Sequence, residues 1–445
     1  MAPPPARLIE SNEDLVAVFH DAEKPRKAWR IGTEAEKFGV HGSGRPAVFE
    51  GEIAEVLARL AARHGWSPYR EHPDRPVIAL RRGWANITLE PGGQLELSGA
   101  PLDTIHQTEL EFAGHLAEVH AVSKDLDLSW LGLGFRPLAR QDELPWVPKL
   151  RYGVMREYLP TRGGRALDMM RRTATVQANL DYENVEDAFR KLRVGLRLQP
   201  LVGAMFANAP YLEGKGGIRS HRLAVWSDVD PDRTGLLPLL WEGEPDYARY
   251  VEWALDAPMF LVIRDGVPHP NTGQTFRAYL KDGHQGLQAT FEDWETHLNT
   301  LFPEARLKKT LEMRGVDGQR HKYLPAVPAL WKGLLYEPEA LSKAESLAGT
   351  IHFDALEKAR PTFATTGLQG SLQGRALGAW ASDVLAIATE GLARLGNLNA
   401  KGEDESIYLE PLAALVAAGR CPADEVVEAV GDDPTQEALL RAASA

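Results

Sequence analysis

Glu34 and Glu36 stand two residues apart in a segment that is predicted to form a strand over 29–40. Alternate residues of a strand point to the same face, so these two carboxylates are neighbours that repel each other. A divalent cation between them would remove the repulsion, and carboxylate oxygens are the ligands that Mg²⁺ prefers. The competing interpretation is a solvated strand edge on which both acids are simply exposed.

A second pair of carboxylates belongs to the segment 89–101, where a Pro-Gly-Gly sequence predicts a tight turn between two short strands. After the turn, Gln94, Glu96 and Ser98 alternate with leucines and therefore share one face. Glu90 closes the first strand at the same end. The segment is either a hairpin that presents Glu90 and Glu96 to a site or a half-exposed hairpin whose acids face water.

Polar residues alternate again along 173–181, and this alternation predicts a strand with Gln177 and Asn179 on the same face. Such a face points either to solvent or into a polar site. The pattern does not decide between the two.

Charged residues that suit anion binding lie further along the chain. Glu312 and Arg314 share a face of a strand expected over 306–317. The irregular segment 219–235 combines arginines with Ser, His and Thr, which suits phosphate or carboxylate binding, although a polar surface loop would look the same. Its candidate arginines are Arg219, Arg222 and Arg233.

Short strands carry these residues, and helices are expected between them. A Pro-, Arg- and Gly-rich connection over 137–170 could cover a pocket. The periodic patterns predict helices over 12–21, 52–64, 102–125 and 185–208, with further strands near 77–81, 86–90 and 126–134. An antiparallel sheet curled around a site would bring the carboxylates together, where they could hold two or three divalent ions and, through them, a triphosphate.

Composition excludes several classes of protein. The net charge of −12 argues against a nucleic-acid partner, and the single cysteine, Cys421, allows no intrachain disulfide. No apolar run approaches the roughly 18 residues of a membrane span, and the first seven residues do not resemble a signal peptide, so a cytoplasmic location without membrane contact is expected. Phosphate-loop, dinucleotide-binding, zinc and serine-hydrolase motifs are absent from the sequence.

Taken together, the motifs resemble those of glutamate–cysteine ligases of the plant and proteobacterial type. The matching stretches follow one another from about residue 8 to about residue 395, and the segments 89–101 and 169–181 are long and specific. The full set of matching stretches is 31–36, 89–101, 131–135, 169–181, 219–235 and 307–317.

The resemblance implies an α+β fold related to glutamine synthetase, with a curved antiparallel β-sheet forming a funnel and helices around it. It implies ligation of L-glutamate to L-cysteine with ATP as co-substrate and Mg²⁺ as cofactor, the first step of glutathione biosynthesis. In such ligases the γ-carboxylate of glutamate attacks the γ-phosphate of ATP, and the cysteine amine then attacks the γ-glutamyl phosphate.

The resemblance also assigns roles to residues of this chain. Arg314 would neutralise charge on the transferring phosphoryl group, and Glu96 would act beside it as a catalytic metal ligand. Gln177 occupies a position where more distant ligases carry a histidine. The implied metal ligands are Glu34, Glu36, Glu96 and Glu312, with Glu90 as a further candidate. The candidates for contact with nucleotide, phosphate or the glutamate carboxylate are Gln177, Asn179, Arg219, Arg222 and Arg233.

Some features stay open at this stage. Residues 1–395 are expected to form the catalytic domain and 396–445 a C-terminal helical extension, with no prediction of oligomeric state. Plant members are regulated through disulfides, which one cysteine cannot reproduce, so we expect no intramolecular redox switch. The alternatives are a γ-glutamyl ligase with a different acceptor amine, such as 2-aminobutyrate, and a non-catalytic nucleotide-binding homologue.

Overall fold

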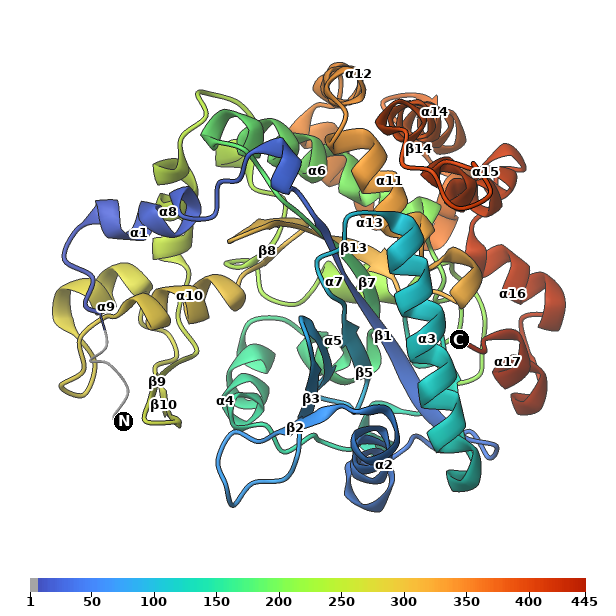
Figure 1. Ribbon diagram of the computed structural model, residues 1–445, viewed down its shortest axis with the longest axis horizontal. Helices are drawn as coiled ribbons and strands as arrows, with labels where there is room; N and C mark the ends of the chain where they lie inside the picture. Colours follow the sequence, from blue (N-terminus) through green and yellow to red (C-terminus); the bar gives the residue numbers. More distant parts are fainter. Residues whose placement is uncertain (1–6) are drawn as a thin grey trace.

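The computed structural model describes residues 7–445 and contains one large antiparallel sheet with helices around it (Figure 1). β6 (Leu128–Leu131) pairs with the end of the long strand β1. The remaining strands follow the order β12 (Ala305–Leu307), β13 (Leu311–Asp317), β7 (Thr175–Leu180), β1 (Ile31–His41), β5 (Leu95–Ser98), β4 (Ala85–Leu89), β3 (Ala79–Arg82) and β2 (Ser67–Tyr69). The predicted α+β class is therefore confirmed.

Helices account for most of the remaining chain. They are α1 (Asn12–His20), α2 (Ala54–His64), α3 (Ile105–Ser123), α4 (Leu150–Tyr158), α5 (Ala166–Arg172), α6 (Val185–Met205), α7 (His221–Trp226), α8 (Tyr247–Asp256), α9 (Phe276–Asp282), α10 (Phe291–Asn299), α11 (Ala326–Leu335), α12 (Pro338–Gly349), α13 (Phe353–Thr366), α14 (Leu377–Leu395), α15 (Glu410–Ala417), α16 (Pro422–Val430) and α17 (Gln436–Ala442). The short strands outside the sheet are β8 (Thr234–Gly235), β9 (Leu261–Arg264), β10 (Val267–Pro270), β11 (Phe302–Pro303), β14 (Ser371–Leu372) and β15 (Arg375–Ala376). Among residues 7–445, no helix is both long enough and apolar enough to cross a membrane.

One face of the sheet is apolar and packs against helices. Ile31, Ala35, Leu97 and Ala178 alternate with the polar residues of their strands and are at most 2% exposed. α6 packs against β13, and α11 packs against β7 and β1. Burial of such a side chain contributes about 1.5–3 kcal/mol for the larger aliphatic residues. The period-two pattern thus turns the polar residues of the same strands toward the other face.

The register of the central strands places the predicted site residues next to one another. Glu36 of β1 lies opposite Glu96 of β5, and Glu34 lies opposite Gln177 of β7. On the far side of β7, Glu312 of β13 lies opposite Asn179. The sheet therefore carries a row of polar side chains across four adjacent strands.

The turn before β5 is tight and closely packed. Gly93 has a φ of 81°, which favours glycine, and the Glu90 amide donates to the Gln94 carbonyl at 2.9 Å. A Cβ on Gly92 would lie 2.4 Å from the carbonyl oxygen of Arg171 in α5. Both glycines are therefore needed where the hairpin meets α5.

Two expectations about local structure were incomplete. The connection over 137–170 contains α4 and α5, so it is partly helical rather than irregular. The segment 306–317, expected as a single strand, forms β12 and β13 with a turn between them, and Arg306 pairs with Glu312 in register. Both differences matter for the site. They bring Lys149, Arg151 and Arg306 to the cavity described below, which the strand pattern did not predict.

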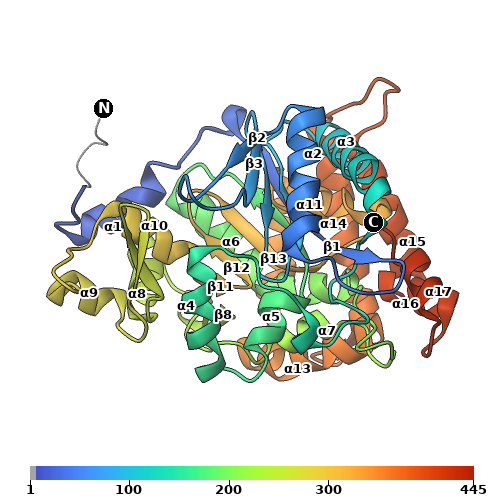
Figure 2. The ribbon, with the colours of Figure 1, turned by 90° about the horizontal axis from the view of Figure 1, so that it is seen from below.

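The two ends of the described chain lie on opposite sides of the molecule. α8–α10 with the β9–β10 hairpin form a lobe beside α1, far from α15–α17 in Figures 1 and 2. Beyond the predicted boundary at residue 395, the buried carboxylate of Glu405 pairs with Lys332 of α11 at 2.7 Å. The amide of Ala445 donates to the carbonyl of Trp130 in β6 at 2.9 Å. Residues 396–445 are thus attached to the sheet and to α11.

Candidate active site

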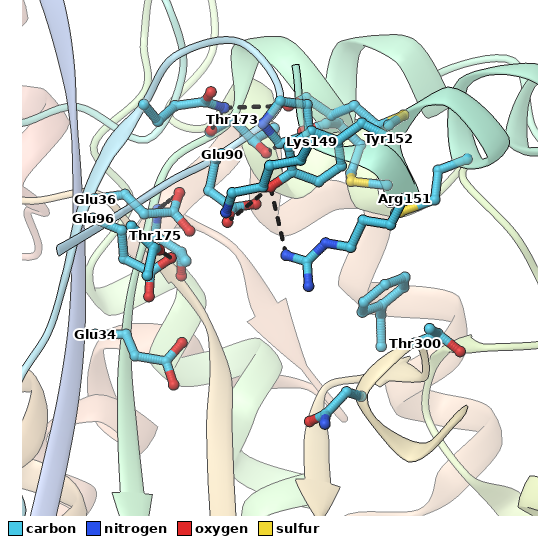
Figure 3. A pocket seen from close by; sticks show the side chains of 18 of the residues that line it. Glu34, Glu36, Glu90, Glu96, Lys149, Arg151, Tyr152, Thr173, Thr175 and Thr300 are labelled. Carbon is cyan, nitrogen blue, oxygen red and sulfur yellow. Dashed lines mark hydrogen bonds between the residues drawn. The ribbon is translucent and has the colours of Figure 1, made fainter. Parts of the chain in front are cut away.

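A cavity of about 500 Å³ opens at the polar face of the sheet. Figure 3 shows Glu34, Glu36 and Glu96 along one side and Arg151 and Thr300 across from them. The lining comes from β1, β4, β5, β7, β11, β12 and β13, and from α4, α5, α7, β9 and α10. Residues that are far apart in the chain therefore meet at one site.

Four carboxylates line this cavity, and they are called the acid row below: Glu34, Glu36, Glu90 and Glu96. Neutral groups donate to all four, and the Tyr152 hydroxyl donates to Glu90 at 3.4 Å. Asn179 Nδ2 donates to Glu34 at 2.9 Å, and the Thr175 amide donates to Glu36 at 3.1 Å. Thr88 Oγ1 donates to Glu96 at 3.1 Å. Within residues 7–445, no lysine, arginine or histidine forms an ion pair with any member of the acid row.

The acid row is electrostatically strained. Burial, together with the charges of Glu312 and Glu96, raises the pKa of Glu34 to about 7. Burial and the charges of Glu90 and Glu96 raise the pKa of Glu36 well above its usual range. Burial and Glu90 likewise raise the pKa of Glu96. Buried like charges without a counter-ion favour either a bound proton or a bound cation.

Glu312 has the opposite environment, although it lies only two strands from Glu34. It is fully buried, and its carboxylate pairs with Arg306 at 2.7 Å, Lys308 at 2.7 Å and Arg314 at 2.5 Å. Burial opposes ionisation, but these three cations outweigh it and hold the pKa of Glu312 well below its usual range. Glu312 does not line the cavity, whereas Arg306 and Arg314 do.

Arg314 and Arg222 form the cationic side of the cavity. Arg314 Nη1 donates to Gln177 Oε1 at 2.8 Å, which places the predicted Gln177 at the cavity wall. Arg222 Nη2 donates to the carbonyl of Arg314 at 2.8 Å. The Nε of Arg222 and the Nε1 of Trp226 are buried without a hydrogen-bond partner. Both residues line the cavity.

Two predicted arginines lie elsewhere. Arg219 pairs with Asp424 of α16 at 2.6 Å and does not line the cavity. Arg233 is fully buried, pairs with Asp230 at 2.7 Å and donates to the carbonyl of Pro258 at 2.7 Å. The structure therefore gives both side chains protein partners and brings neither into the group around Arg222. Asn179 also stays outside the lining and acts through its hydrogen bond to Glu34.

The sequence analysis missed a second cationic group at the start of α4. Lys149 and Arg151 face the acid row from the other side of the cavity (Figure 3). Burial and the charge of Arg151 lower the pKa of Lys149 to about 8, although Glu90 and Glu96 oppose the shift. The available signal was the composition of 137–170, which suggested a pocket cover but no particular residue. Apolar side chains that also line the cavity are Met155, Met169, Met170, Phe260, Leu261 and Ile263.

The acid row fits a divalent cation by its chemistry. Within residues 7–445, no three acidic, histidine or cysteine side chains converge closely enough to form a ready-made metal site. However, the row offers only hard oxygen donors, and burial together with the charges of neighbouring glutamates raises the pKa values of Glu36 and Glu96. A divalent cation bound among these carboxylates would relieve the repulsion between them.

Comparison with known proteins agrees with this geometry. The family model for glutamate–cysteine ligase family 2 matches residues 30–443. The chloroplastic glutamate–cysteine ligase of Brassica juncea is 42% identical over 423 residues, covering 94% of this chain and 80% of that enzyme. The chloroplastic enzyme of Arabidopsis thaliana is 41% identical over 441 residues, covering 97% and 83% of the two chains.

Two solved structures share the fold. The glutamate–cysteine ligase of Francisella tularensis in complex with AMP has a TM-score of 0.56 at 13% identity, covering 93% of this chain and 87% of that one. A bifunctional glutathione synthetase from Pasteurella multocida has a TM-score of 0.51 at 14% identity, covering 97% of this chain and 52% of that one. These likenesses confirm the predicted type of fold, an antiparallel sheet with surrounding helices.

The comparisons also correct one prediction and establish the family. The plant relatives are named as chloroplastic enzymes, which contradicts the expectation of a cytoplasmic location. The match to the family model spans nearly the whole chain, and the identity to the plant enzymes exceeds 40% over more than nine-tenths of it. The chain therefore belongs to glutamate–cysteine ligase family 2.

Proposed function

We propose that this protein is an ATP-dependent ligase that joins the γ-carboxylate of L-glutamate to the amine of L-cysteine, with Mg²⁺ held by the acid row. One observation carries the proposal: the acid row and two arginines, Arg222 and Arg314, line the same cavity, and no residue forms an ion pair with the acid row within residues 7–445. Phosphoryl transfer needs positioned charges rather than a protein nucleophile. This chain supplies both signs of charge at one site.

The proposed reaction has two steps. The γ-carboxylate oxygen of glutamate bonds to the γ-phosphorus of ATP as the bond to the bridging oxygen breaks, and ADP leaves. The cysteine amine then bonds to the γ-carbonyl carbon, phosphate leaves, and the amine loses a proton. Bound Mg²⁺ would neutralise phosphate charge and hold the triphosphate in place.

The residues of the chain have separate tasks in this scheme. Arg314 and Arg222 stabilise negative charge on the transferring phosphoryl group, because both guanidinium groups line the cavity beside Gln177. Lys149 and Arg151 are suited to hold a substrate carboxylate on the opposite side. Glu36 and Glu96 serve as ligands of the cation rather than as general bases.

The acceptor amine is the less specific part of the proposal. The sulfur-containing and aromatic side chains of Met155, Met170 and Phe260 give the cavity an apolar region that suits a small side chain. Such a region discriminates by only about 1–3 kcal/mol per methylene. A thiol-free amine such as 2-aminobutyrate is therefore the main competitor to cysteine.

Phosphate release from MgATP and L-glutamate, with and without L-cysteine, tests the proposal. We expect release that depends on cysteine, with γ-glutamylcysteine detected by mass spectrometry. Release that depends on a different amine would reassign the acceptor and keep the mechanism. ATP binding without release in the presence of any amine would contradict the proposal and favour a non-catalytic homologue.

A further inference from the structure

Methionine side chains form part of the wall of the active-site cavity. The chain has seven methionines, and Met155, Met169 and Met170 line the cavity. Met155 belongs to α4, whereas Met169 and Met170 are neighbours in α5, where Met170 is 2% exposed. Oxidation converts the apolar thioether of a methionine into a polar sulfoxide. An oxidant that enters the cavity can therefore change the chemistry of this wall.

The other methionines within residues 7–445 are shielded from solvent. Met205 of α6 is 0% exposed, and Met259 and Met313 are each 1% exposed. None of these three residues lines the cavity. Met155 and Met169, by contrast, are 8% and 9% exposed. Since a dissolved oxidant attacks the side chains that solvent reaches, it should reach Met155 and Met169 first.

The single cysteine, Cys421, is a poor competitor for an oxidant. Its side chain is fully buried and lies outside the cavity lining. Burial and the charge of Asp424 raise the pKa of the Cys421 thiol, so the thiol stays protonated at neutral pH. The thiolate is the reactive form of a cysteine. Within residues 7–445, the cavity methionines are therefore the sulfur-containing side chains most open to oxidation.

We propose that Met155 and Met169 are sites of modification by hydrogen peroxide, and that their sulfoxides weaken the binding of the acceptor amine. In this reaction the sulfur lone pair bonds to one peroxide oxygen as the O–O bond breaks. The departing hydroxide takes the proton of the sulfur-bound oxygen and leaves as water. No disulfide forms, so one cysteine per chain does not limit this chemistry. The site of modification follows from exposure alone, whereas the effect on binding rests on the proposed function.

The effect on binding follows from the place of these side chains in the lining. Met155 belongs with Phe260 to the apolar region that suits the side chain of the acceptor. A sulfoxide oxygen accepts hydrogen bonds and retains water, so it disfavours an apolar group beside it. We expect the KM of the acceptor to rise about tenfold, the scale of a small change in an apolar pocket. Glu36 and Glu96 lie on β1 and β5 and are not altered, so the KM of MgATP should change little.

Limited oxidation of the full-length protein with hydrogen peroxide, followed by peptide mass spectrometry, tests the site of modification. We expect sulfoxides at Met155 and Met169 before any appear at Met205, Met259 or Met313. Peroxide is then removed by gel filtration, because the acceptor L-cysteine reacts with it, and the KM values of L-cysteine and MgATP are measured by phosphate release. Treatment with methionine sulfoxide reductases should restore the KM of L-cysteine.

Leucine variants separate the cavity methionines from those of the core. The double variant Met155→Leu and Met169→Leu keeps the volume and apolar character of both side chains but lacks their sulfur. We expect its acceptor KM to be the same before and after peroxide treatment. Met205→Leu is the matched control, because Met205 is buried in the core, and peroxide should raise its acceptor KM as in the wild type.

Each outcome supports or overturns the inference. Sulfoxides that form in the core methionines as early as at Met155 and Met169 overturn it, and so does an unchanged acceptor KM after both residues are modified. A rise in KM that persists in the double variant also overturns it. If the double variant does not fold, the reductases decide, because failure to restore the KM of the oxidised wild type overturns the inference. Absence of ligase activity before oxidation overturns the proposed function and the effect on binding, whereas mass spectrometry still decides the site of modification.

Discussion

Glu36 of β1 is half-buried and Glu312 of β13 is fully buried, two strands apart in one sheet, and their electrostatic states are opposite. The pKa of Glu36 is raised well above its usual range by burial and by the charges of Glu90 and Glu96. The pKa of Glu312 is held well below its usual range, because Arg306, Lys308 and Arg314 outweigh the effect of burial. The comparison shows that a carboxylate's neighbours, more than its depth, determine whether it needs an external cation.

The largest expected effect is a loss of folding stability when Glu312, the carboxylate with three cationic partners, is replaced. Glu312→Gln leaves three buried or half-buried cations without their common partner. Loss of one side of a buried ion pair costs about 3–5 kcal/mol, so we expect a fall of that order in the free energy of unfolding. Urea denaturation measures it. An unchanged midpoint would mean that Glu312 is not the anchor of the three cations.

Replacing a carboxylate that has no ion-pair partner should lower activity and leave folding stability intact. Glu36→Gln and Glu96→Gln relieve repulsion, so we expect folding stability to be kept or increased while kcat falls by about 10²–10³-fold, the scale of a lost electrostatic contact in the transition state. Phosphate-release kinetics and thermal unfolding of the same preparations check both parts. Full activity of either variant at limiting Mg²⁺ would remove that residue from the metal-binding set.

The pH dependence of stability provides a third test. The pKa of Glu34 is about 7 in the folded protein against an ordinary 4.5, so between these pH values the unfolded chain has lost a proton that the folded chain keeps. The free energy of unfolding should therefore fall as the pH rises from about 4.5 to about 7, by at most about 3 kcal/mol for this group. Asp317, whose burial raises its pKa to about 6, adds a change of the same sign.

The control for this prediction is Glu34→Gln, which should flatten the dependence while the part due to Asp317 remains. Urea titrations of both proteins at several pH values, in the presence of a chelator, provide the measurement. Mg²⁺ should restore stability at pH 7 in the wild type more than in the variant. A variant whose profile overlays the wild type would contradict the raised pKa of Glu34.

The smallest effect on stability and activity is expected for Arg219, which belongs neither to the acid row nor to the ion pairs of Glu312. Arg219 is partly exposed and pairs with Asp424, so Arg219→Ala should cost no more than about 1 kcal/mol of stability. Its kcat/KM should stay within about twofold of the wild type, because the side chain does not line the cavity. A large loss of kcat/KM with unchanged stability would return Arg219 to the substrate-binding set.

The sequence predicted the sheet and most of the acid row because period-two alternation is a local property. Glu34, Glu36 and Glu96 could be placed on one face before any contact was known. The ion pairs of Glu312 could not be predicted in the same way. They depend on the turn that separates β12 from β13 and sets Arg306 opposite Glu312, and the segment had been interpreted as one strand.

Irregular segments were the weakest part of the prediction, because the contacts of their side chains are set by distant parts of the chain and not by a local pattern. Arg219, Arg222 and Arg233 have the same side chain and lie in one segment, yet the structure brings only Arg222 to the cavity. Their partners, such as Asp424 for Arg219, come from distant parts of the chain. Lys149 was missed because it caps the N-terminus of α4 inside the Pro-, Arg- and Gly-rich connection, whose composition pointed to no particular residue.

The contact between Gly92 and α5 has a mechanical consequence. Gln94 Nε2 donates to the carbonyls of Met170 and Thr173, and Arg136 Nη2 donates to the Gly92 carbonyl at 2.8 Å. These hydrogen bonds join the wall of the cavity that carries Glu96 to the wall that carries Met170. We expect a widening of the cavity that admits a nucleotide to come from the other lobe, where β9 and α10 line the opening.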